Sequence, residues 1–128
     1  MNIAERLDSM RKAFPAFSTL AYADISTGMI LYASAESELR QEHLDALCAT
    51  AVEMLQGAAA TQVAQALGAE DAGDIHEAII MEPGEIGIFL KSTCNPADAL
   101  CCVGRPSVDL AAFRSLARDH LDAIGEDR

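Results

Sequence analysis

Two short segments of the chain are apolar at consecutive positions rather than at alternating ones. They are "AIIM" at 78–81 and "ALCCV" at 99–103. Successive side chains of a β-strand point to opposite faces of its sheet, so strands of this kind need apolar cover on both faces. Helices on both sides of a sheet supply that cover. The sequence therefore predicts a three-layer α/β domain.

Segments with helical spacing of apolar residues lie at both ends and in the middle of the chain. The first covers 3–14 and ends before Pro15, because proline cannot continue a helix. The middle helix, over about 40–67, is the longest, and the last covers 107–124. Gly57 falls inside the middle helix, where glycine costs about 0.5–1 kcal/mol relative to alanine, so its presence there needs a reason.

Five predicted strands fill the intervals between these helices. A hairpin over 17–34 turns at "DISTG", where Gly28 accepts a positive φ. After the middle helix come "HEAIIM" (76–81), "EIGIFLK" (85–91) and "ALCCV", separated by turns at "EPGE" and "NPAD". The predicted order is helix, two strands, helix, three strands, helix.

Length and charge restrict the class of protein. The 128 residues have the size of one domain, 1–128, and the net charge is −11. Binding to nucleic acid or to an anionic membrane needs a basic surface, so neither is an expected partner. No segment has the apolar length of a signal peptide or a membrane span. We therefore expect a cytoplasmic protein, in which the four cysteines are reduced thiols.

The cysteines raise the question of redox or metal chemistry. Cys101 and Cys102 are adjacent on a predicted strand, so they point to opposite faces and cannot bind one metal ion together. No Cys-x-x-Cys spacing occurs, and Cys48 has the spacing of a core position in the middle helix. Free cysteine behaves as a small hydrophobe, which favours core packing. A disulfide between Cys94 and Cys101 across a hairpin is the alternative.

No other group of residues carries a catalytic or metal-binding pattern. His43, His76 and His120 lie in different elements, without a second ligand at metal spacing. The acidic segment "EDAGDIHE" (70–77) lacks the spacing of an EF-hand, so a solvated loop is favoured over a calcium site. No nucleophile elbow or phosphate loop is present. We expect no catalytic residue, no metal and no cofactor, and thus a protein that is not an enzyme.

One side of the middle helix carries small residues where a solvated face normally carries lysine, arginine and glutamate. Small residues let another helix approach closely. The alternative is that alanine is merely a good helix former, but this does not explain Gly57. If "HEAIIM" is an edge strand, its unpaired backbone groups favour pairing with another chain, and helix and strand together form an isologous dimer interface. The predicted interface residues are Ala46, Ala49, Thr50, Glu53, Gly57, Ala60, Ala64, His76, Ala78 and Ile80.

The order of elements, with "FSTLAYADISTGMILYAS" followed by a long helix, resembles the roadblock/dynein light-chain family. "DISTGMILYAS" is similar to the family's Asp, turn, Gly and apolar strand, and "AIIMEPGEIGIFL" to its third and fourth strands. The resemblance covers the chain from about Ile3 to Ile124. It implies a longin-like fold: a five-stranded, mainly antiparallel sheet with one long helix on one face and the terminal helices on the other.

The resemblance also implies a function. Members of this family are non-catalytic, commonly dimerise through the long helix and the third strand, and act as scaffolds, as regulators of small Ras-like GTPases or as dynein accessory chains. The expected function is therefore a homodimeric interaction module for a small GTPase or a similar regulatory protein. The alternative is a small-molecule-sensing domain of the PAS or profilin type, which needs a cavity with a few converging polar groups.

Overall fold

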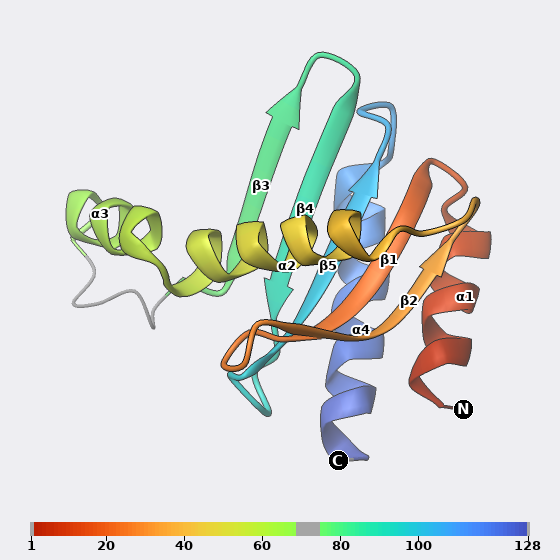
Figure 1. Ribbon diagram of the computed structural model, residues 1–128, viewed down its shortest axis with the longest axis horizontal. Coiled ribbons are helices and arrows are strands. Elements are labelled where there is room, and N and C mark those ends of the chain that lie inside the picture. The colour runs from red at the N-terminus through yellow and green to blue at the C-terminus, as the bar shows by residue number, and fades with distance from the viewer. Residues whose placement is uncertain (1, 69–74, 128) are drawn as a thin grey trace.

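The computed structural model describes residues 2–68 and 75–127 (Figure 1). Its helices and strands follow the order that the sequence predicts, except that the middle helix is divided in two. They are α1 (Ile3–Ala13), β1 (Phe17–Asp24), β2 (Met29–Ala35), α2 (Gln41–Gln56), α3 (Ala58–Ala66), β3 (Glu77–Glu82), β4 (Glu85–Lys91), β5 (Asp98–Gly104) and α4 (Leu110–Glu126).

The strands form one five-stranded sheet in the order β2-β1-β5-β4-β3, and every neighbouring pair is antiparallel. β5 lies between the two hairpins and joins them. The edges of the sheet are β2 and β3. The predicted fold class is thereby confirmed, and "HEAIIM" lies at an edge of the sheet, which is the condition on which the predicted strand pairing depends.

Three layers result, because α2 covers one face of the sheet while α1 and α4 cover the other (Figure 1). Strand β1 shows how the sequence distinguishes the two faces. Its large side chains, Leu20 and Tyr22, pack against α1 and α4, whereas Ala21 and Ala23 lie under α2. Small residues on one face allow α2 to lie close to the sheet, and large residues on the other fill the space beneath two helices.

The middle helix is broken at Gly57, so the predicted single helix over 40–67 was wrong. Gly57 has extended geometry, with φ −86° and ψ −166°, and ends α2 while preceding α3. A Cβ at this position would lie 2.8 Å from the Cα of Glu53, closer than real contacts allow. The Glu53 carboxylate accepts a hydrogen bond of 2.8 Å from the Ala59 N–H in the first turn of α3. The break therefore requires glycine at position 57, because glycine has no Cβ to collide with Glu53.

No helix within 2–68 and 75–127 is both long and apolar enough to cross a bilayer. Three residues of the predicted acidic loop, Glu70, Asp71 and Asp74, lie outside the described residues.

Candidate functional site

The outer side of α2 carries the first part of the predicted interface. Cys48, Ala51 and Leu55 point toward the sheet and are buried. On the other side Ala46 and Ala49 are exposed. Thr50 is half-buried and Glu53 is exposed beside them. These four residues, Ala46, Ala49, Thr50 and Glu53, are called the α2 stripe below.

The remaining helical residues of the predicted interface do not continue the α2 stripe. Gly57 forms the break between the helices. Ala60 and Ala64 are buried within the chain, with exposed fractions of 3% and 0%. The change of direction at Gly57 gives α3 a different orientation from α2, so helical spacing counted through the break no longer identifies one face.

The three predicted residues in or beside β3 lie at the edge of the sheet. His76 is exposed just before the strand, and Ala78 and Ile80 are half-buried on the face covered by α2. The N–H of Lys91 donates to the carbonyl of His76 at 2.8 Å. His76 and Lys91 are therefore a hydrogen-bonded pair in the antiparallel ladder between β3 and β4.

The alternation of antiparallel pairing then sets the direction of the backbone groups of β3. Ala78 and Ile80 bond to β4, while the N–H and C=O groups of Glu77, Ile79 and Met81 point outward from the sheet. The side chains of Ile79 and Met81 are 41% and 68% exposed. This edge therefore offers both backbone hydrogen-bonding groups and apolar side chains to a further strand.

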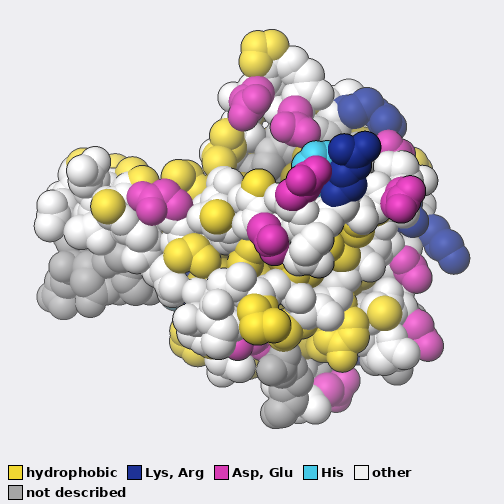
Figure 2. Space-filling model, viewed as in Figure 1, with side chains coloured by type: hydrophobic (Ala, Val, Ile, Leu, Met, Phe, Trp, Pro, Cys, Tyr) yellow, Lys and Arg dark blue, Asp and Glu magenta, His cyan; other side chains and the backbone are white. Residues whose placement is uncertain are grey.

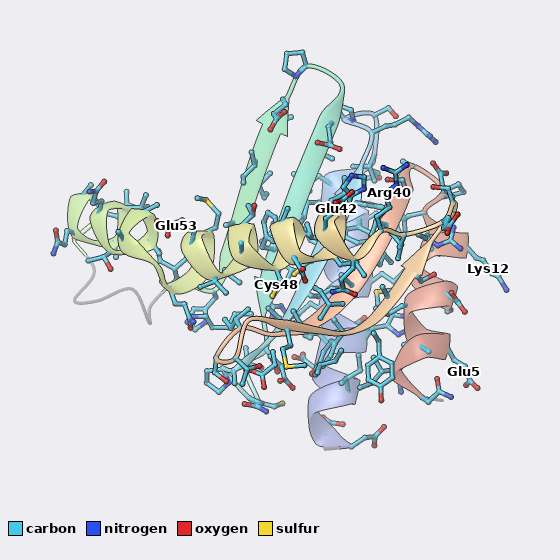
Figure 3. The ribbon with its side chains drawn as sticks, viewed as in Figure 1. Glu5, Lys12, Arg40, Glu42, Cys48 and Glu53 are labelled. Atoms are coloured by element: carbon cyan, nitrogen blue, oxygen red, sulfur yellow. The ribbon has the colours of Figure 1, made fainter. Side chains whose placement is uncertain are left out.

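The α2 stripe lies on one face of the sheet, with Ala46 and Thr50 beside the ends of β1 and β5 and Glu53 near the end of α2 (Figure 3). Helix α2 crosses the sheet from β1 toward β3, and its last turns lie beside β3 (Figure 1). The helix that carries the α2 stripe thus runs toward the open strand, and Glu53 is the stripe residue nearest to the end that lies beside β3 (Figure 3).

An ion-pair cluster fixes β3 to α4. Glu77 accepts hydrogen bonds from Arg114 Nε at 3.1 Å and from Arg118 Nη2 at 2.9 Å, and a further bond comes from Arg114 Nη2. Arg118 Nη1 donates to the carbonyl of Lys91 on β4 at 2.7 Å. The two arginines therefore act within the chain rather than as a free basic surface. The one sequence signal for this cluster is the four-residue spacing of Arg114 and Arg118, which places both side chains on the same side of a helix.

We expect Glu77→Gln to lower stability in a pH-dependent way. Burial raises the pKa of Glu77, but hydrogen bonds from Arg118 and Arg114 outweigh it and bring the pKa below its ordinary value. A depressed pKa stabilises the fold above the unfolded pKa of about 4.3, and this contribution is lost as pH falls through the folded value. At pH 7 the substitution should cost about 1 kcal/mol of unfolding free energy, measured in urea.

The difference between wild type and Glu77→Gln should shrink between pH 7 and pH 3.5. Glu82→Gln, at an exposed position of the same strand, is the matched control and should be near neutral. An equal loss at both pH values would show that the charge of Glu77 is not responsible.

The cysteines occupy the positions that strand alternation predicts. Cys101 lies under α2 and Cys102 under α1 and α4, and both are fully buried. Cys48 is buried as well, Cys94 is exposed, and all four are free thiols, so the Cys94–Cys101 disulfide is not formed. Within the described ranges no three His, Cys, Asp or Glu side chains are grouped as they would be around a metal ion.

We expect one fast-reacting thiol in the native protein. Burial raises the pKa of Cys101 and of Cys102, and burial also raises that of Cys48, so their thiolates are scarce at neutral pH. Titration with a coloured disulfide reagent at pH 8 should detect Cys94 alone, and all four cysteines in denaturant. Cys94→Ser should abolish the fast signal. A second fast thiol would contradict the core assignment.

A groove runs beside α2 on its face of the sheet. Its larger part, about 390 Å³, lies between the first half of α2 and the ends of β1 and β5, and Glu38, His43 and Thr50 contribute polar groups. A smaller hollow of about 140 Å³ continues toward β3, where Ile80 and Phe89 line it. A third hollow, about 310 Å³, lies between α3 and β3.

The face around α2 is acidic. Asp and Glu side chains are spread over it, whereas Lys and Arg gather at its right-hand side (Figure 2). Arg40 and Glu42 lie at the start of α2 and Glu53 near its end (Figure 3). Arg40 and Glu42 form an exposed ion pair at 3.8 Å. Such exposed charges stabilise little but set the sign of the local potential.

No protein-family model matches the sequence. No curated protein sequence matches it either. Solved structures do match, and one is a roadblock/LC7 domain from Streptomyces avermitilis, with a TM-score of 0.77 and 11% identity over 97% of this chain and 95% of that one.

Two further similar structures come from other bacteria. The gliding protein MglB from Thermus thermophilus matches with a TM-score of 0.74 and 15% identity, over 95% of this chain and 84% of its own. MglC from Myxococcus xanthus matches over 100% of both chains with a TM-score of 0.65 and 10% identity. At this identity the likeness concerns the fold, and it agrees with the order of strands and helices described above. The chain has a roadblock-type, longin-like fold.

Proposed function

We propose that this chain is a non-catalytic, cytoplasmic interaction module that forms a homodimer and binds a regulatory protein. The observation that carries the proposal is the open β3 edge, together with the α2 stripe on the helix that runs toward this edge. One is a template for strand pairing and the other for close helix packing. A two-fold axis beside β3 would pair the two β3 strands and place both α2 helices on one face of the joined sheet, so that each copy uses the same surface, as an isologous interface requires.

In the proposed dimer a two-fold axis passes beside β3. The β3 strands of two copies pair antiparallel and join the two sheets, while the two α2 helices lie on one face of the joined sheet and approach each other through the α2 stripe. A structure entitled "MglB with tetrameric arrangement", with a TM-score of 0.75 and 15% identity, supports self-association as a property of this fold. Light scattering of the wild type tests the dimer, and a monomer at micromolar concentration would refute it.

The proposed partner is a small Ras-like GTPase. The resemblance to the roadblock family supports this class, and the paired α2 helices would offer an acidic platform that exists only in the dimer. We expect such a complex to weaken with salt, because charge complementarity is screened over about 8 Å at physiological ionic strength. The experiment is a titration with purified Ras-like GTPases of the same organism, each loaded with GDP or a non-hydrolysable GTP analogue.

Charge reversal distinguishes the acidic platform from the opposite layer. Asp45 is exposed on α2, and its bond from Gln41 Nε2 at 2.8 Å stays within that helix. Asp45→Lys should weaken GTPase binding, whereas Lys12→Glu, at an exposed site on α1, should not. Glu53 is unsuitable because it caps α3, and Arg114 and Arg118 are unsuitable because they hold β3. The opposite ranking would place the partner on the α1 and α4 layer.

A small-molecule sensor remains the second candidate, because of the groove beside α2. Its volume of about 390 Å³ falls within the range of ligand sites, about 300–1,000 Å³. Ser18, Glu38 and His43 are polar groups that line it. A thermal-shift screen with nucleotides and metabolites separates the two candidates, since a ligand that binds only the folded state raises its stability.

A further inference from the structure

A small hollow lies between α2 and the turn that joins β3 to β4, and we call it the hairpin hollow. Its volume is about 140 Å³, whereas sites for free small molecules measure about 300–1,000 Å³. The hairpin hollow therefore has room for one long side chain rather than for a whole ligand. Its lining residues are Leu47, Thr50, Ile80, Glu82, Glu85, Gly87, Phe89 and Val103.

Two carboxylates face each other at the rim of the hairpin hollow. Glu82 and Glu85 are cross-strand partners at the end of the ladder between β3 and β4, and both line the hollow. Acidic side chains at the tip of this hairpin are visible in Figure 2. Like charges directly opposite each other on neighbouring strands are destabilising. A cation bound between the two carboxylates would remove this repulsion.

No cation of the described residues occupies this place. Neither lysine nor arginine lines the hairpin hollow or the groove that it continues, and neither Glu82 nor Glu85 forms an ion pair in the described part of the chain. Arg105, just beyond the end of β5, donates to the carbonyl of Pro15 at 3.2 Å. No three His, Cys, Asp or Glu side chains within the described ranges are grouped as a metal ion requires. The cation that fits is therefore an organic one from another molecule.

Gly87 keeps the floor of the hairpin hollow free of a side chain. Glycine in the interior of a strand weakens the strand and often marks a place where another group approaches closely. Gly87 pairs with Ile80 of β3 on one side and with Val103 of β5 on the other. A Cβ at this position would lie 3.3 Å from a ring carbon of Phe89. Glycine therefore leaves space above an apolar floor, directly beside the two carboxylates.

We propose that the hairpin hollow receives an arginine side chain of the partner protein. The guanidinium group lies between the carboxylates of Glu82 and Glu85, and its aliphatic stem lies along Leu47 and Val103. A planar guanidinium offers N–H groups on two edges to two carboxylates, whereas the ammonium group of lysine is a single point charge. This inference rests on the proposed function as an interaction module, and it locates one contact on the acidic face around α2.

Titration with a capped arginine tests the hairpin hollow without requiring a dimer or a GTPase. The probe is acetyl-arginine methylamide, and NMR spectra of the isotope-labelled chain follow the backbone amides. We expect saturable shifts at Gly87, Glu85 and Val103. Capped citrulline, which has nearly the same shape without the charge, should give no saturable shift, and capped lysine should bind more weakly than capped arginine. Equal shifts with arginine and citrulline, or saturable shifts elsewhere only, would overturn the proposal.

Variants separate a specific contact from general attraction to an acidic protein. Glu82→Gln with Glu85→Gln should weaken arginine binding about tenfold, because charge-assisted hydrogen bonds are lost. Both positions are exposed, so the fold should persist. Glu36→Gln with Glu126→Gln removes the same charge at exposed sites outside the hollow and should leave binding unchanged. Gly87→Ala, which keeps both carboxylates, should also weaken binding. Equal losses in the two double variants would contradict a specific site.

The outcomes distinguish the hairpin hollow from the proposed function. A wild-type monomer, or a failure of every Ras-like GTPase to bind, would overturn the proposed function, and the capped-arginine titration would still decide the hollow. A GTPase complex whose affinity is unchanged by Glu82→Gln with Glu85→Gln would overturn the assignment of the arginine to the partner protein. We expect that affinity to fall about tenfold, as for the capped arginine.

Discussion

Arginine in place of Ala49 is expected to convert the homodimer into a monomer. Ala49 is exposed at the middle of the α2 stripe, where the proposed dimer brings two helices into contact. A long cationic side chain would hold the helices apart and bury an unpaired charge, which costs about 3–5 kcal/mol. This corresponds to a rise of at least a hundredfold in the dissociation constant. Light scattering coupled to gel filtration measures it.

The control places the same substitution in the opposite layer. Ala111 is an exposed alanine of α4, so Ala111→Arg has the same change in size and charge away from the proposed interface. It should remain dimeric, and both variants should keep the wild-type circular dichroism spectrum. Equal dissociation in the two variants, or a persistent dimer in Ala49→Arg, would contradict the role of the α2 stripe.

Gly104→Ala is expected to give the largest loss of stability in the sheet. Gly104 ends β5, is buried and pairs with Phe17. A Cβ there would lie 2.8 Å from the carbonyl oxygen of Ala16 and 2.9 Å from the Cα of Phe17, and backbone cannot rotate away. Phe17 stacks on Phe113 with ring centroids 4.0 Å apart, so a shift would disturb the packing of α4.

The expected cost of Gly104→Ala is about 1–3 kcal/mol, as for other overpacked cores. Thermal unfolding should show a decrease of roughly 4 °C for each kcal/mol. Gly87→Ala is the control, because the nearest atom to its added Cβ is a ring carbon of Phe89 at 3.3 Å, which belongs to a side chain. Both must be compared at one protein concentration, since dimerisation adds to stability. Equal stability of wild type and Gly104→Ala would contradict the close packing.

Periodicity in the sequence predicted the order of strands and helices, because most of that order depends on local patterns. The assignment of Cys101 and Cys102 to opposite faces needed only the alternation of a strand, and the structure confirms it. Gly28 has a φ of 74°, as the predicted turn requires. Each of these features depends only on residues that are close together in the sequence.

Features that depend on contacts between residues distant in the sequence could not be predicted from local sequence patterns. The break at Gly57 arises from a capping bond between Glu53 and Ala59, and the helical spacing of alanines continues through it unchanged. The pairing of Glu77 with Arg114 and Arg118 joins residues 37 and 41 positions apart. Neither the burial of Ala60 and Ala64 nor the position of α3 beside β3 follows from composition, because both result from the new direction of the chain after Gly57.

Cross-linking at the β3 edge tests the central claim, dimerisation through this strand, most directly. In a Cys94→Ser background the three remaining cysteines are buried, so a new cysteine reacts alone. Ile79→Cys on β3 and Leu31→Cys on β2 start from side chains of similar exposure, 41% and 39%, on opposite edges of the sheet. A short bis-maleimide should give a covalent dimer with Ile79→Cys and only monomer with Leu31→Cys. A covalent dimer with Leu31→Cys alone would contradict the account, and so would the absence of a covalent dimer in both variants.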